Sequence, residues 1–188
     1  MQPHYFFALV LPDDVKEKIA DEMKGRNELF KRLVHKEDYH LTLAFVGAAD
    51  LSGLEKACVF IEENIKHIPV FELKLTSFGT FGQKTSPRIF WIGTNEPSSL
   101  FDVQKGVAAA CRKAGISIDE KPFRPHITTA RKWAGSEPYV PDVLPEWPSF
   151  PAAEIALYET KRAPGPKYVK KWSCLLSGSG EEQEPWRN

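Results

Sequence analysis

The sequence reads YHLTLAFVG at residues 39–47 and PHITTAR at residues 125–131. Both stretches contain the tripeptide His-x-Thr, which begins at His40 in the first and at His126 in the second. Both are rich in residues that favour β-structure, so each is predicted to form a strand. Side chains at i and i+2 lie on the same face of a strand. Each tripeptide therefore places an imidazole beside a hydroxyl, while the residue between them faces the core.

Two similar halves packed around a cleft would bring four of these side chains together, namely those of His40, Thr42, His126 and Thr128. The ordinary histidine pKa of about 6.5 allows one imidazole to accept a proton from water while the other, protonated, donates to a departing ribose oxygen. Each threonine hydroxyl can donate to a non-bridging phosphate oxygen in the transition state. The paired tripeptides therefore predict hydrolysis of a strained cyclic phosphate without a nucleophilic side chain.

Ordinary helix and strand signals surround both tripeptides. Strands are predicted over residues 6–11, 39–47, 71–75, 89–92, 126–131, 154–160 and 168–176. Three amphipathic helices are predicted, with starts near Pro12, Ser52 and Ser99. The first of them should bury Val15, Ile19 and Met23. Prolines at 138, 141, 145, 148 and 151 predict that residues 132–151 form a surface connection.

Strands interleaved with three helices favour an α+β fold, and a His-bearing strand in each half of the chain indicates two pseudo-symmetric lobes. We therefore expect residues 1–176 to form a single bilobal catalytic domain, in which antiparallel sheets with outer helices surround a central cleft. Each lobe would contribute one His-x-Thr tripeptide. The polar residues 177–188 are expected to form a flexible tail.

Charge and cysteine content limit the partners and the compartment. Lys and Arg together number 25, as do Asp and Glu, so no overall positive field favours binding of duplex nucleic acid. Any binding of RNA must therefore depend on a local group of positive side chains. Three widely spaced cysteines suit a reducing compartment. The opening apolar run at residues 6–11 is too short to cross a membrane, so we expect a cytoplasmic protein. We expect a monomer, because the sequence shows no exposed apolar stripe.

The two stretches resemble the motifs of the two-histidine (2H) phosphoesterases, and in particular those of bacterial RNA 2′,3′-cyclic phosphodiesterases, formerly called 2′-5′ RNA ligases. The likeness covers nearly the whole chain and includes LYET at residues 157–160. It implies a bilobal α+β fold with a central cleft, and an RNA end with a 2′-phosphate as the product. It also implies that His40 is the proton donor to the leaving 3′ oxygen and that His126 is the proton acceptor that activates water.

Other residues enter the predicted site through the same resemblance. Arg131 would face away from His126 in an ideal strand, yet the family often carries arginine there, and a guanidinium matches phosphate oxygens. Tyr168 is expected at the rim of the cleft, where it could stack on a base. Thr129 departs from the family, which usually has an apolar residue at that position. We expect only a packing effect, since position 129 lies on the opposite face of the strand.

No metal or cofactor is expected. No cysteine or histidine pair has the spacing of zinc ligands, and no glycine-rich loop is followed by a lysine and a hydroxyl residue, as ATP binding would require. The remaining histidines, His4, His35 and His67, are assigned to no site.

Two other kinds of function use the same residues. The acid and base pair would also serve a reversible 2′-5′ RNA ligase, or a phosphodiesterase that acts on 2′-5′-linked oligonucleotides. A non-catalytic module could bind RNA or a nucleotide in the same cleft. The two intact His-x-Thr tripeptides argue against the module, because binding alone requires no acid and base pair.

Overall fold

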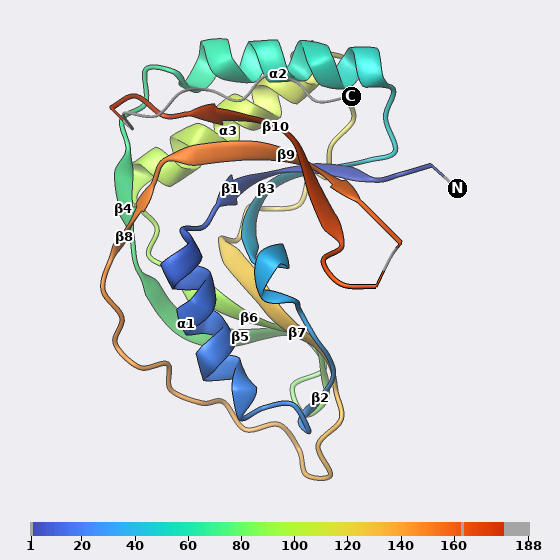
Figure 1. Ribbon diagram of the computed structural model, residues 1–188, viewed down its shortest axis with the longest axis vertical. Helices are drawn as coiled ribbons and strands as arrows, with labels where there is room; N and C mark the ends of the chain where they lie inside the picture. The colour runs from blue at the N-terminus through green and yellow to red at the C-terminus, as the bar shows by residue number, and fades with distance from the viewer. Residues whose placement is uncertain (1, 163, 179–188) are drawn as a thin grey trace.

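The two His-bearing strands lie in different sheets of an α+β fold, which confirms the predicted fold class (Figure 1). The computed structural model describes residues 2–162 and 164–178. One sheet has the order β10-β9-β1-β3, formed by Tyr168–Leu175, Glu154–Thr160, Tyr5–Val10 and His40–Gly47. The other has the order β2-β7-β6-β5, formed by Phe30–Leu33, His126–Trp133, Pro87–Thr94 and Leu75–Gly82. All the strand pairs in these sheets are antiparallel.

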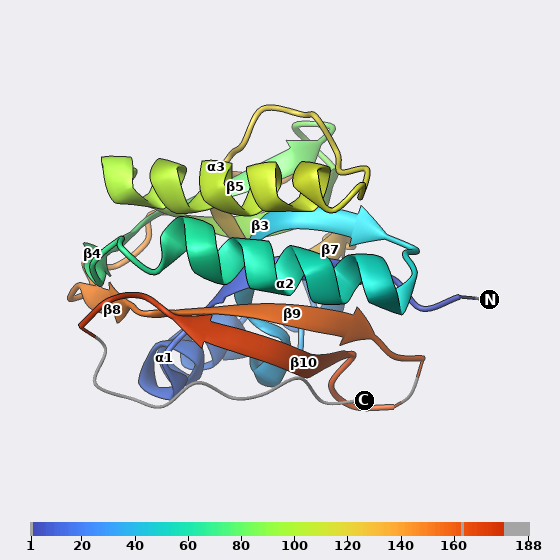
Figure 2. The ribbon, with the colours of Figure 1, turned by 90° about the horizontal axis from the view of Figure 1, so that it is seen from above.

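Helices cover these sheets, and their ranges are α1 (Asp13–Lys24), α2 (Leu51–Ile65) and α3 (Ser98–Lys113). The helix α1 lies over the β2-β7-β6-β5 sheet and buries Val15, Ile19 and Met23, as predicted (Figure 1). The helices α2 and α3 lie side by side (Figure 2), and Gly106 permits their close approach, because a Cβ atom there would come within 2.9 Å of Ile65 Cγ2. In the described part of the chain, no helix has the length and apolar character needed to cross a membrane.

A β-bulge interrupts each His-bearing strand at the same distance from its histidine. The register between β1 and β3 shifts at Leu43, and the register between β6 and β7 shifts at Thr129. A bulge adds one residue that has no direct partner, so the side chains beyond it change faces. Phe45 and Arg131 therefore lie on the same strand faces as the histidines. In an ideal strand Arg131 would face away from His126, and the bulge is the reason that it does not.

The helix α2 begins earlier than the sequence signal indicated. Asp50 is its N-cap, and the Asp50 carboxylate accepts a hydrogen bond from the backbone N–H of Gly53 at 2.8 Å. The helix start predicted near Ser52 is therefore two residues late. Aspartate and serine are both good N-caps, so the side chain that meets the free backbone amides determines the boundary.

Additional strands account for the remaining differences. The strands β2 and β8 (Phe150–Ala152) are absent from the sequence prediction, because four or three residues carry too little periodicity. The predicted 71–75 strand is divided, since β4 (Phe71–Leu73) pairs with β8 and β5 starts at Leu75. The strand β5 then continues to Gly82, where glycines had indicated a loop. The long irregular connection consequently covers residues 134–149 rather than 132–151.

The buried side chains of both sheets and of all three helices form one core cluster. A single domain over residues 1–176 is compatible with this core, and the division stays a prediction. At the start of the predicted tail, the backbone of Ser177 bonds with Val70 and Ile68. Residues 179–188, which make up most of the predicted tail, lie outside the described residues.

The long connection is fastened to the body of the protein by Arg26, which follows α1. Its guanidinium forms an ion pair with Asp142 from the connection and another with Glu22, at 3.1 Å. The same group lies 4.7 Å from the centre of the Phe78 ring. A largely buried charge with two partners and an aromatic face beneath it is typical of a structural clamp.

We predict that Arg26→Ala lowers the free energy of unfolding by about 1–3 kcal/mol, because it leaves the partly buried Glu22 carboxylate without its partner and removes the contact with the Phe78 ring. Urea unfolding of the variant and the wild type measures the difference. Lys24→Ala is the matched control, since Lys24 pairs with Asp21 on an exposed surface, and its effect should stay below about 0.5 kcal/mol. Equal losses in the two variants would show that Arg26 is an ordinary surface cation.

Candidate active site

His40 and His126 occupy equivalent positions in the two sheets. Each is the first residue of its strand, and the strands β3 and β7 contact one another. The Nδ1 atom of His40 lies 2.7 Å from the carbonyl oxygen of Asp38, and that of His126 lies 2.6 Å from the carbonyl oxygen of Arg124. In both lobes the carbonyl belongs to the residue two positions before the histidine, so the local arrangement is repeated.

These hydrogen bonds fix the tautomer of each neutral imidazole. A carbonyl oxygen only accepts hydrogen bonds, so Nδ1 must carry the proton and Nε2 must lack one. In His40, the free Nε2 atom lies 3.1 Å from Oγ1 of Thr42, whose hydroxyl donates to it. Each Nε2 atom can therefore take a proton from a bound group, or give one back when the ring is protonated.

Aromatic rings hold both imidazoles in place. The His40 ring lies 4.6 Å from the Phe6 ring and meets the Tyr168 ring edge-on at 5.1 Å, measured between centroids. The backbone N–H of Tyr168 donates to the Asp38 carboxylate at 3.1 Å, which ties the start of β10 to the residue that orients His40. The His126 ring meets the Phe81 ring edge-on at 5.0 Å. Neither imidazole can swing freely, which suits groups that must transfer protons in a fixed direction.

The surroundings disfavour positive charge on both rings. Burial lowers the pKa of His40 to about 4, and the nearby charges of His126 and Arg131 contribute to the shift. Burial also lowers the pKa of His126, again with a contribution from Arg131. Without a ligand both rings are therefore largely neutral at pH 7. A bound phosphate anion would favour protonation of one of them, because it offsets the positive charge of Arg131.

The three threonines of the two stretches divide into two groups. Thr42 and Thr128 are half-buried and lie on the same strand faces as the histidines. Thr129 is fully buried, and its hydroxyl donates to the carbonyl oxygen of Phe90 at 3.4 Å. Thr129 thus satisfies its hydroxyl inside the core and leaves the cleft unchanged.

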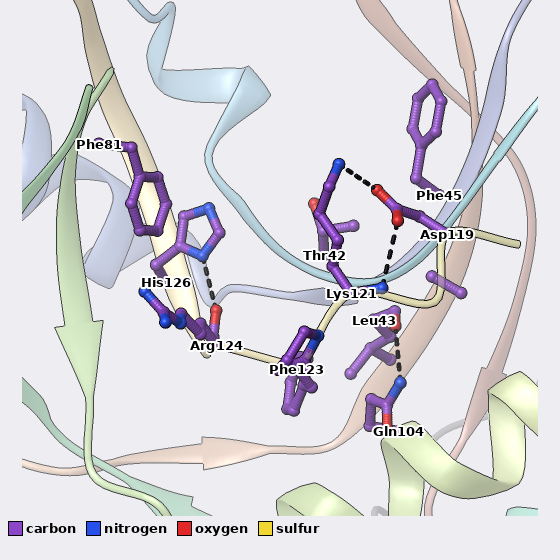
Figure 3. A pocket seen from close by; sticks show the side chains of 12 residues that line it. Thr42, Leu43, Phe45, Phe81, Gln104, Asp119, Lys121, Phe123, Arg124 and His126 are labelled. Carbon is purple, nitrogen blue, oxygen red and sulfur yellow. Dashed lines mark hydrogen bonds and ion pairs between the residues drawn. The ribbon is translucent and has the colours of Figure 1, made fainter. Parts of the chain in front are cut away.

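A pocket of about 450 Å³ lies at one end of the two tripeptides (Figure 3). We call it the aromatic pocket, after three of the side chains that line it: Phe45, Phe81 and Phe123. Its polar lining residues are Thr42, Gln104, Asp119, Lys121, Arg124 and His126. Figure 3 shows His126 between Phe81 and Arg124, so the pocket opens directly beside one of the two imidazoles.

A second pocket, of about 400 Å³, lies at the other end of the tripeptides. We call it the cationic pocket, because Arg32, Arg131 and Lys167 line it together with His35. Tyr168 and Asp38 complete its polar lining. Asp38 is buried, and both of its carboxylate oxygens accept the backbone N–H of Lys167 at 2.9 Å.

The two pockets are related by the repeat of the His-x-Thr strands. The aromatic pocket takes Phe45 from the end of the first stretch and Arg124 from just before the second. The cationic pocket takes Asp38 from just before the first stretch and Arg131 from the end of the second. The strands β3 and β7 therefore run in opposite directions past one another, with Thr42 and His126 at the aromatic pocket and the Tyr168 neighbour of His40 at the cationic pocket.

The structure places predicted side chains at both pockets. Thr42 and His126 line the aromatic pocket, His40 contacts Tyr168 of the cationic pocket, and the catalytic roles of His40, Thr42, His126 and Thr128 stay predictions. Arg131 and Tyr168 both line the cationic pocket.

Several lining residues were not predicted from the sequence: Arg32, His35, Phe45, Phe81 and Arg124. Arg32 lies in the unpredicted strand β2, and His35 was assigned to no site. A signal for Phe45 was present, since it follows its histidine at the same distance as Arg131.

The geometry offers no evident metal site. Among residues 2–162 and 164–178, no group of three or more His, Cys, Asp or Glu side chains could hold a metal ion. Cys58, Cys111 and Cys174 are buried, unpaired thiols, and burial raises the pKa of each. A reaction without a metal stays a prediction that an experiment with a chelator can test.

Comparison with known proteins identifies the same repeat. The sequence model of a family described as LigT-like phosphoesterases matches residues 10–91 and matches again over residues 92–168. Each matched segment contains one His-x-Thr tripeptide. The two matches therefore correspond to the two predicted lobes.

Curated relatives share one name. A Geobacillus stearothermophilus protein named RNA 2′,3′-cyclic phosphodiesterase is 39% identical over 171 residues, which is 88% of this chain and 54% of the relative. The chain thus spans about half the length of that relative. A Bacillus subtilis protein with the same name is 29% identical over 94% of this chain and 98% of its own length. A crystal structure of Escherichia coli LigT complexed with 3′-AMP superposes with a TM-score of 0.78, at 25% identity, over 94% of this chain and 99% of that one.

The depressed pKa of His40 predicts how stability depends on pH. Between pH 6.5 and about 4 the unfolded chain binds a proton at His40 that the folded chain does not bind, so the free energy of unfolding falls as the pH falls. Urea unfolding at several pH values should show this loss, and His40→Asn should show a smaller one. The control is His67→Asn, since His67 is exposed. A wild-type slope retained in His40→Asn would contradict the assignment.

Proposed function

This chain belongs to the LigT-like phosphoesterase family, and from that premise we propose that it hydrolyses 2′,3′-cyclic phosphates at RNA ends to 2′-phosphates, with His40 and His126 as acid and base. The observation that carries the proposal is the repeated geometry of the two tripeptides. Both Nδ1 atoms lie within hydrogen-bond distance of carbonyl oxygens, so both Nε2 atoms are unprotonated in the neutral rings and available for proton transfer, that of His40 once the Thr42 hydroxyl turns to the substrate.

The proton transfers follow from this arrangement. His126 Nε2 accepts a proton from water as the water oxygen bonds to phosphorus. The bond from phosphorus to the ribose 3′ oxygen breaks, and protonated His40 donates its Nε2 proton to that oxygen. The phosphate remains on the 2′ oxygen, and proton exchange with solvent restores both rings. The near-symmetric geometry suits either order of roles, and the family resemblance assigns the donor role to His40.

The negative charge that develops on the phosphate oxygens in the transition state is stabilised from several sides. The hydroxyls of Thr42 and Thr128 can donate to the non-bridging oxygens, and the guanidinium of Arg131 supplies positive charge nearby. The bound anion offsets that positive charge and so raises the low histidine pKa values toward neutrality, as a proton donor requires. The substrate therefore contributes to the protonation of the acid that acts on it.

The aromatic pocket supports a nucleoside as the rest of the substrate. Phe45 and Phe123 offer ring faces, and Arg124 offers a planar cation, all within reach of His126. Stacking of this kind binds any base without requiring duplex structure. An RNA end with a free terminal base fits this pocket, whereas a stacked base pair would not.

Two general properties stay part of the proposal. We infer that the protein works in the cytoplasm as a monomer. Ligation in the reverse direction uses the same acid and base, and the first assay should therefore include it.

We predict that His40→Ala and His126→Ala each lower kcat by about a hundredfold or more, the usual contribution of a general acid or base. The assay is hydrolysis, in EDTA, of a short RNA that ends in a 2′,3′-cyclic phosphate, with identification of the terminal phosphate. The wild-type enzyme should give a 2′-phosphate and a bell-shaped pH profile. Retained activity in either variant, or loss of wild-type activity in EDTA, would refute this mechanism.

We predict that Thr42→Val and Thr128→Val each lower kcat by about ten- to a thousandfold, with a small change in KM, because the lost hydrogen bond strengthens in the transition state. Thr129→Val is the matched control, since its hydroxyl bonds inside the core. That control should leave kcat within about twofold of the wild type. A similar loss in all three variants would indicate a packing effect instead of phosphate contact.

A further inference from the structure

The cationic pocket contains more positive charge than the proposed reaction uses. Arg32 from β2, Arg131 from β7 and Lys167 from the segment before β10 line one space of about 400 Å³. None of these three forms an ion pair with a carboxylate of the described residues. The chain as a whole has a formal charge of zero, so this local excess is not a reflection of composition.

The two arginines are placed directly opposite one another. Arg32 of β2 pairs with Arg131 of β7 in the antiparallel register, so their side chains leave the same face of neighbouring strands. Like charges in this position repel and destabilise a sheet, unless an anion lies between them. The carboxylate of Asp38 faces the pocket, but it already accepts backbone N–H groups from Lys167 and Tyr168. An anionic ligand would therefore relieve a repulsion that the protein leaves in place.

The position of the pocket limits what this anion can be. Thr42 and His126 line the aromatic pocket, whereas Asp38 and Tyr168, which both contact His40, line the cationic pocket. With the cyclic phosphate at the histidines and the terminal base in the aromatic pocket, only the 5′ oxygen of the terminal ribose continues into the RNA chain. The next phosphodiester is then the nearest further negative charge of the substrate.

We propose that the cationic pocket binds the phosphodiester on the 5′ side of the terminal nucleotide, so that the enzyme prefers RNA ends to free cyclic mononucleotides. This inference rests on the proposed function and names its substrate class. Arg32 and Lys167 contact the additional phosphate, while Arg131 lies between that phosphate and the reacting one. Two guanidinium groups and an ammonium group bind the oxygens of an anionic phosphodiester more strongly than they bind a neutral ligand.

The test compares two substrates that differ by one phosphodiester. Adenosine 2′,3′-cyclic phosphate is the mononucleotide, and the adenylyl dinucleotide with the same cyclic end is the longer substrate. The wild-type kcat/KM should favour the dinucleotide by about tenfold or more, mainly through a lower KM, because the added contact binds ground state and transition state alike. A dinucleotide with a neutral methylphosphonate linkage should lose this preference.

Variants assign the preference to the pocket. Arg32→Gln and Lys167→Gln should each reduce the ratio of dinucleotide to mononucleotide kcat/KM several-fold. Lys31→Gln is the matched control, because Lys31 lies on the same strand, is exposed, and does not line the pocket. It should leave the ratio unchanged.

Each outcome decides one question. Equal kcat/KM values for the two substrates in the wild type would overturn the proposed phosphodiester site while leaving the hydrolase function intact. A preference that survives the neutral linkage would assign the gain to the second nucleoside and would also overturn it. Failure to hydrolyse either cyclic phosphate would instead refute the proposed function itself.

Discussion

Two hydrogen bonds, from His40 Nδ1 to the Asp38 carbonyl and from His126 Nδ1 to the Arg124 carbonyl, determine what the site can do. Each bond fixes the tautomer of one imidazole and holds that histidine, the first residue of its strand, in one orientation. The aromatic neighbours then restrict the rings further. Without these bonds, the imidazoles could present either nitrogen to a ligand, and a defined transfer of protons in opposite directions would be lost.

The bulges extend this arrangement to the two pockets. In both strands the extra residue comes three positions after the histidine, and it turns the residue at the fifth position toward the cleft. One lobe places Phe45 there and the other places Arg131. The scaffold is therefore nearly symmetric while its two pockets differ, one suited to stacking on a base and the other suited to phosphate. An RNA end has the same asymmetry, with a base on one side of the ribose and a charged chain on another.

Electrostatics join the pockets to the chemistry. Burial and the charge of Arg131 lower the pKa of both histidines, so the ligand-free site is largely neutral at the imidazoles and positive at the cationic pocket. An arriving phosphate reverses this balance, because its negative charge favours a protonated ring. Under the proposed mechanism, the site therefore acquires its acid only when an anion is bound.

The sequence by itself determined the local chemistry of the site. Each His-x-Thr tripeptide lies within seven to nine residues whose strand preference is strong, and strand alternation alone places the imidazole beside the hydroxyl. The strands and helices predicted around the tripeptides also sufficed to predict the α+β class, and helical periodicity predicted the buried face of α1.

The tertiary structure decided which distant side chains share a pocket. Arg32 lies in a four-residue strand that only its pairing with β7 makes recognisable, and Arg131 reaches the cleft through a bulge that depends on the register with β6. The closeness of Asp38 to Lys167 likewise arises from hydrogen bonds between residues far apart in the chain. Periodicity reports which face a side chain occupies within one element, whereas register and packing between elements are long-range properties, and these were settled only when the whole chain folded.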